Sequence, residues 1–119
     1  MRSFTGSSDQ RSVADARHFV MAAVTAQGHH QLVWAAGLLT SEVTTNAVLH
    51  GKTGFDVRVT GTSEGVRVEV DDDAPGDPVV RRTDSTSVRG RGMLIVEALS
   101  RRWGVERLAS KAKTVWFEL

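Results

Sequence analysis

The sequence predicts an α+β fold, in which helices cover one face of a mixed, mostly antiparallel sheet and form a two-layer sandwich. A change of hydrophobic period is the main indication. Apolar residues recur every three or four positions up to residue 50 and every second position from residue 55. The 119 residues are the usual length of one domain with its own core. We therefore expect a single domain over residues 1–119.

Two helices are expected in the first half of the chain, after a short strand over residues 2–5. Ser12 is expected to cap the first helix, and Gly28 is expected to end it. The second helix is expected from about His30 to His50, with Gly51 as its end.

The second half is expected to hold two hairpins around one more helix. Valines alternate with polar residues over residues 55–60 and 66–71, on either side of a turn. Residues 73–91 carry both prolines and no visible period, and loops of this length in a compact domain are usually functional. A short helix is expected over 92–100, followed by strands over 103–108 and 113–119.

Composition narrows the function classes. The formal net charge is +1, which does not favour general binding to nucleic acid. The chain has no cysteine, so disulfides and cysteine metal sites are excluded. No apolar run is long enough to cross a bilayer, and residues 1–10 lack the apolar stretch of a signal peptide. We expect a cytoplasmic protein that acts without a membrane or direct nucleic-acid contact.

The first informative motif places Glu42, Asn46 and His50 one helical turn apart, on one helix face. A carboxylate and an amide beside an apolar stripe cost free energy unless something pairs with them. A hydrated magnesium ion that carries a phosphate is a natural partner. The alternative is a polar helix margin in water. His50 fits either a phosphate contact or a helix-terminal histidine favoured by the helix dipole.

The second motif is the acidic end of a strand. Counting by twos from Val66 places Asp72 on the apolar face, towards the helices, with Asp71 and Asp73 on the other face. A carboxylate at the margin of a core needs a hydrogen-bond partner, and the amino group of adenine would serve. An ordinary acidic turn is the alternative.

The third motif is Gly90-Arg91-Gly92-Met93 at the expected start of a helix. Unpaired amides at a helix start favour anions, and glycines let the backbone approach a phosphate closely. Arg89 and Arg91 add positive charge there. A flexible hinge is the alternative.

The three motifs, in this order, resemble those of the GHKL ATPase superfamily, and more narrowly the anti-sigma factor serine kinases of the RsbW and SpoIIAB type. Two phrases carry the resemblance. One is Ser-Glu-x-x-Thr-Asn-Ala-Val-x-His from Ser41, and the other is Gly-Arg-Gly-Met-x-Ile-Val-x-x-Leu-x-x-Arg-Trp-Gly from Gly90. The resemblance covers nearly the whole chain and implies the Bergerat ATP-binding fold, with the segment 73–91 as a lid loop.

The resemblance implies roles for individual residues. It implies that Asn46 coordinates Mg²⁺, that Glu42 is the general base and that Asp72 reads adenine. The implied nucleotide-binding set is completed by Ala74, Gly76, Arg89, Gly90, Arg91, Gly92, Met93 and Thr114. One departure is Pro75, which stiffens the start of the lid loop where the family pattern is rich in glycine.

The function implied by the resemblance is that of an ATP- and Mg²⁺-dependent serine protein kinase and anti-sigma factor. Its implied partners are a sigma factor and a STAS-domain antagonist that carries the target serine, and a homodimer is also implied. A nucleotide-binding partner-switch module without kinase activity is the alternative. A sensor histidine kinase catalytic domain ranks lower, because the chain has no obvious dimerisation helix with a phospho-accepting histidine.

Overall fold

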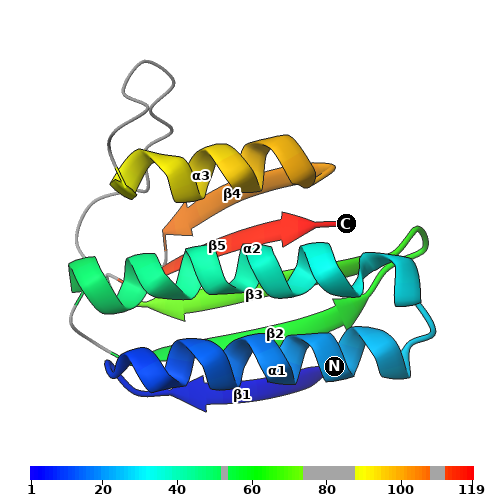
Figure 1. Cartoon of the computed structure of the whole chain (residues 1–119), viewed down its shortest axis with the longest axis horizontal. Helices are drawn as coiled ribbons and strands as arrows, with labels where there is room; N and C mark the ends of the chain where they lie inside the picture. Colours follow the sequence, from blue (N-terminus) through cyan, green and yellow to red (C-terminus); the bar gives the residue numbers. More distant parts are fainter. Residues whose placement is uncertain (52–53, 74–87, 108–111) are drawn as a thin grey trace.

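The computed structural model describes residues 1–51, 54–73, 88–107 and 112–119, with side chains throughout except at residues 50–51 and 88–92. These residues form a five-stranded sheet with helices on one face (Figure 1). The strand order is β1-β2-β3-β5-β4, and the pairings among these described strands are all antiparallel. The predicted α+β two-layer sandwich is confirmed, although the sheet is antiparallel throughout the described strands rather than mixed.

The strands lie close to their expected positions. Their bounds are β1 Arg2–Gly6, β2 Phe55–Gly61, β3 Val66–Asp72, β4 Arg102–Arg107 and β5 Lys113–Glu118. Both hairpins are therefore confirmed. The last strand returns between β3 and β4, so that β5 pairs with both neighbours and lies inside the sheet. This position brings the start of β5 beside the end of β3.

The first helix, α1, spans Gln10–Ala26 and begins two residues before the expected cap. Asp9 is the cap, because its side chain accepts the backbone N–H of Arg11 at 2.8 Å. The hydroxyl of Ser12 instead accepts the backbone N–H of Ser7 at 3.0 Å. The prediction of Ser12 as the cap was therefore wrong. Gly28 follows the helix with φ of +84°, a conformation that favours glycine.

The second helical segment runs without a break from a 3₁₀ turn, His30–Leu32, through α2, Val33–Asn46, into a π-helical turn, Ala47–Gly51. By length and composition its stretch His30–Leu49 is long and apolar enough to cross a membrane, which corrects the expectation that no run of this chain is. In this fold many apolar residues of the stretch belong to the core, whereas Trp34 and Leu49 are exposed. Leu39, Val43 and Ala47 are almost fully buried, and α2 lies between α1 and α3 over the sheet (Figure 1).

The third helix, α3, spans Val88–Leu99 and begins four residues before the expected start at Gly92. Gly90 and Gly92 are therefore inside the helix, and the last residues of the expected loop 73–91 are helical. Each interior glycine disfavours a helix by about 1 kcal/mol relative to alanine. Packing outweighs this, because Met93 and Val96 are fully buried in the common core.

The core lies between the helices and the sheet and is built from alternate strand residues. In β2 and β3 every second side chain is buried. The buried apolar set is Ala16, Val20, Ala23, Val24, Ala36, Leu39, Val43, Ala47, Val48, Phe55, Val57, Val59, Val66, Val68, Val70, Met93, Val96, Val115, Phe117 and Leu119. Asp72 continues the buried side of β3 with only 5% of its surface exposed. The helix-facing side of β3 thus ends in a carboxylate.

The sheet face opposite the helices carries charges that pair with one another. Arg67 donates to Glu118 at 3.0 Å and lies 3.6 Å from Glu69. Its guanidinium lies 4.1 Å from the ring centroid of Trp116, within the range of a cation–π contact. The Arg67–Glu118 pair follows the β3–β5 register, and Arg67 and Glu69 are neighbours on the same face of β3.

Gly65 is a close-contact position in the turn before β3. A Cβ atom there would lie 2.1 Å from the backbone oxygen of Leu119. We predict that Gly65→Ala lowers the free energy of unfolding by about 1–3 kcal/mol, because the end of β5 must move. Gly61→Ala is the matched control, since its Cβ would meet only the flexible end of Gln27. Urea denaturation checks both variants, and equal effects would contradict the assignment.

Candidate functional site

Three element ends meet at one end of the molecule, at the left of Figure 1. They are the carboxyl end of α2, the amino end of α3 and the carboxyl end of β3. The strand register adds a fourth, because the start of β5 pairs with the end of β3. Each of the three predicted motifs is carried by one of these ends. The fold therefore gathers motifs that are up to 50 residues apart in the sequence.

Glu42 and Asn46 lie on consecutive turns of α2 and are both partly buried. Burial raises the pKa of the Glu42 carboxyl above its usual value, because a partly desolvated site disfavours the charged form. A carboxylate with a raised pKa is better matched to accepting a proton near neutral pH. The helix therefore presents a basic carboxylate and an amide on one face.

The residues available for a metal ion are few. In the described part of the chain, no group of three or more histidine, aspartate or glutamate side chains converges as a metal site. The side-chain oxygen of Asn46 is one atom that a metal ion could use. This fits Mg²⁺, which usually keeps one or two protein oxygens and fills its other positions with phosphate oxygens and water.

Asp72 is the buried carboxylate of the site, and it has a charged neighbour. Its side chain is 2% exposed, and that of Lys113 is 9% exposed. The two residues are partners in the β3–β5 register, and Lys113 Nζ lies 3.7 Å from Asp72 Oδ1. Buried opposite charges stabilise each other, because separate burial of either would be costly. The end of the sheet thus presents an acceptor and a donor side by side.

Asp71 and Thr114 form a separate pair on the opposite face of the sheet. The Thr114 hydroxyl donates to Asp71 Oδ1 at 2.5 Å, and Arg58 donates to both carboxylate oxygens of Asp71. Burial acts to raise the pKa of Asp71, but hydrogen bonds from Arg58 and Thr114 outweigh it and lower the pKa. The structure thus places the Thr114 hydroxyl with Asp71, away from the face of Asp72.

The remaining predicted residues divide into three groups. Ala74 and Gly76 lie outside the described residues. Gly90 and Gly92 lie in the first turns of α3, where the side chains of Arg89 and Arg91 are also outside the description. The amide of Gly90 is among the first four of the helix, which have no partner within it. Met93 is 1% exposed and is a core residue.

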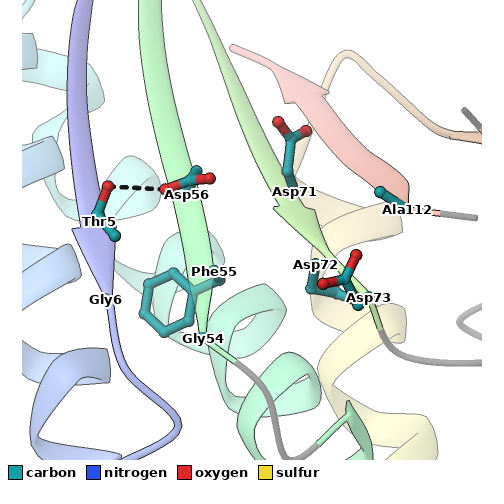
Figure 2. A pocket seen from close by; sticks show the side chains of 9 residues that line it. All are labelled: Thr5, Gly6, Gly54, Phe55, Asp56, Asp71, Asp72, Asp73 and Ala112. Carbon is teal, nitrogen blue, oxygen red and sulfur yellow. Dashed lines mark hydrogen bonds between the residues drawn. The ribbon is translucent and has the colours of Figure 1, made fainter. Parts of the chain in front are cut away.

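A pocket of about 360 Å³ opens beside Asp72 at this end of the sheet (Figure 2). Its lining comes from four strands or their ends: Thr5, Gly6, Gly54, Phe55, Asp56, Asp71, Asp72, Asp73 and Ala112. Four carboxylates disfavour a polyphosphate by charge repulsion. Asp56 is also satisfied by the Thr5 hydroxyl at 2.7 Å. We therefore do not assign the phosphates of a ligand to this hollow.

Lys113 lies beside Asp72 although none of the three sequence motifs contains it. The signal was available in the sequence, because counting by twos back from Phe117 and Val115 places Lys113 on the buried face of β5. What the sequence did not contain was the pairing partner. Only the register of β5 against β3 brings Lys113 to Asp72.

These residues fit a purine nucleotide with its magnesium ion. A buried carboxylate at the end of β3 suits the exocyclic amino group of a base. The free amides at the start of α3 suit phosphate oxygens. Asn46 would offer one oxygen to the metal ion, and Glu42 is a partly buried carboxylate one helical turn away.

Comparisons with known proteins agree with this arrangement. The family model described as the histidine kinase-like ATPase domain matches residues 6–119. The crystal structure of the SiaB-SiaC complex from Pseudomonas aeruginosa contains a chain of similar fold, with a TM-score of 0.65 and 11% sequence identity. The match covers 98% of this chain and 88% of that one, and at this identity it concerns the fold alone. No curated protein sequence matches the chain.

The family match extends over the α2 motif, the end of β3 and the start of α3. It confirms the expected relation to the GHKL ATPases, and such a domain implies ATP binding. This chain belongs to the histidine kinase-like ATPase domain family.

Proposed function

We propose that this protein is an ATP-dependent serine protein kinase that regulates transcription by partner exchange. The observation that carries the proposal is the position of Glu42, a partly desolvated carboxylate on the same helix face as Asn46. An ATP-binding module needs an acceptor for the base and donors for the phosphates. Nucleotide binding alone does not need a carboxylate that can accept a proton. Phosphoryl transfer to a hydroxyl does need such an acceptor.

The chain's own groups would divide the work of transfer. Bound Mg²⁺-ATP supplies the phosphoryl group and the neutralising charge. Asn46 would hold the metal ion, and the first amides of α3 would hold phosphate oxygens in position. Glu42 takes the proton of the incoming serine hydroxyl as the serine Oγ–phosphorus bond forms. The bond from that phosphorus to the departing ADP oxygen breaks in the same displacement.

The proposed partners follow from the family resemblance. A STAS-domain antagonist would present the serine, and a sigma factor would be the rival partner. With these partners the protein would act in the cytoplasm. The structural relative that we identified was solved in a protein complex, which supports a domain that acts on another protein. A homodimer stays a prediction.

The base-reading role of Asp72 predicts a selective loss of binding. We expect Asp72→Asn to weaken ATP binding by about tenfold or more, because a hydrogen bond to a charged acceptor is lost. Asp71→Asn is the matched control, since its carboxylate lies on the other sheet face with Arg58. Calorimetric titration with ATP and Mg²⁺ measures both, after circular dichroism confirms that each variant is folded. Equal weakening by the two substitutions would remove Asp72 from the site.

The role of Glu42 predicts a separation of binding from transfer. We expect Glu42→Gln to lower phosphorylation of a serine-bearing partner by about 10²–10⁴-fold, because the proton acceptor is lost. ATP affinity should stay within about threefold of the wild-type value, because Gln keeps the size of the side chain. Transfer of ³²P to the partner measures the first and calorimetry the second. Undiminished transfer would exclude Glu42 as the base and favour the module without kinase activity.

The raised pKa of Glu42 also predicts a pH-dependent stability difference. The folded state holds the proton more tightly than the unfolded chain, so this group stabilises the fold below its unfolded pKa, about 4.3. That contribution is lost as pH rises through the folded pKa. Glu42→Gln resembles the protonated form. We expect its melting temperature to match the wild type near pH 4 and to exceed it at pH 7. A constant difference across this range would contradict the desolvation of Glu42.

A further inference from the structure

The pair Asp72–Lys113 has a chemical property that a lone aspartate lacks. It places a hydrogen-bond acceptor and a hydrogen-bond donor on neighbouring strands, at directly paired register positions. Both side chains are at least nine-tenths buried. The carboxylate can only accept, and the ammonium can only donate.

Each member of the pair can make more than one hydrogen bond, because an ammonium has three N–H donors and a carboxylate has two acceptor oxygens. Nζ of Lys113 lies 3.7 Å from Oδ1 of Asp72, which is longer than the about 2.7–2.9 Å of a charge-assisted hydrogen bond. The two opposite charges therefore neutralise each other at a distance that is too long for a direct hydrogen bond between these two atoms. A neutral base that binds both would keep the charges balanced, whereas a base that displaced the ammonium would leave a buried carboxylate with less compensation.

The Watson–Crick edge of adenine has the complementary pattern. Its exocyclic amino group donates, and the adjacent ring nitrogen N1 accepts. Asp72 suits the amino group and Lys113 suits N1. Guanine presents the reverse order, with an acceptor at O6 beside a donor at N1. An acceptor and a donor held by two strands in fixed register therefore favour adenine by its edge and not only by its amino group.

We infer that Lys113 is a base-reading residue that donates to N1 of adenine beside the acceptor provided by Asp72. The inference rests on the proposed nucleotide site and deepens it. It assigns specificity to a residue of β5, a strand that the motif analysis connected with the site only through Thr114. The structure favours Lys113 over Thr114 here, because the Thr114 hydroxyl is engaged by Asp71 on the opposite face.

The test uses an ATP analogue that lacks only the acceptor. In 1-deaza-ATP the ring nitrogen N1 is replaced by CH, while the amino group and the triphosphate are retained. We expect the wild-type protein to bind ATP about tenfold or more tightly than 1-deaza-ATP in calorimetric titrations, since one hydrogen bond to a charged donor is lost. In Lys113→Met the ratio of the affinity for ATP to the affinity for 1-deaza-ATP should fall to about one. Lys113→Gln keeps a donor and should retain part of the ratio.

The matched control is Arg102→Met, which removes a cation from the outer face of β4. Arg102 pairs with Glu118 at 3.0 Å, on the sheet face away from the helices. The Arg102→Met variant should show the same ratio of ATP affinity to 1-deaza-ATP affinity as the wild-type protein. This control separates the loss of a particular donor from a general loss of positive charge.

The outcomes are distinct. Equal wild-type affinity for the two nucleotides would overturn the inference while leaving the nucleotide site intact, and it needs no variant to fold. An undiminished ratio in Lys113→Met would also overturn it, because another group would then read N1. Absence of ATP binding by the wild-type protein would overturn the proposed function and this inference together. A ratio above about ten that disappears only in the Lys113 variants would support it.

Discussion

The burial of α2 against the sheet is the constraint on which the site depends. Leu39, Val43 and Ala47 are almost fully buried. Full burial of a leucine or valine side chain contributes about 1.5–3 kcal/mol. Glu42 is only partly desolvated, so the apolar stripe outweighs the unfavourable burial of this one carboxylate. The same packing that stabilises the domain thus holds Glu42 where its pKa is raised, and a looser helix would hydrate it.

The end of β3 shows how two adjacent aspartates acquire different tasks. Asp71 and Asp72 differ by one position, and the pleat sends them to opposite faces of the sheet. On the outer face, Asp71 is held by Arg58 and Thr114, and its pKa is lowered. On the helix face, Asp72 is buried beside Lys113. This is the end of the molecule where the carboxyl ends of α2 and β3 meet the amino end of α3. A shift of register by one residue would exchange the two roles.

The antiparallel sheet separates stability from the site. Its outer face carries the ion pairs Arg67–Glu118 and Arg102–Glu118, which join residues that are directly paired across neighbouring strands. Hydrogen bonds from Arg102 and Arg67 lower the pKa of Glu118, so this carboxylate stays charged over a wide pH range. Asp72 and Lys113 lie at one end of the opposite face.

The sequence by itself determined the helices, both hairpins and the faces of the strands, because these depend on local periods of 3.6 and 2 residues. Glu42 and Asn46 share a helix face for the same reason. Two boundaries expected from the sequence were wrong. Asp9, and not Ser12, caps α1. The helix α3 begins before Gly92, because core packing outweighs the low helix propensity of its glycines. Only the tertiary structure decided that Lys113 lies beside Asp72 and that Thr114 does not. Residues 72 and 113 meet through the register of two strands distant in the chain, and no local period encodes that register.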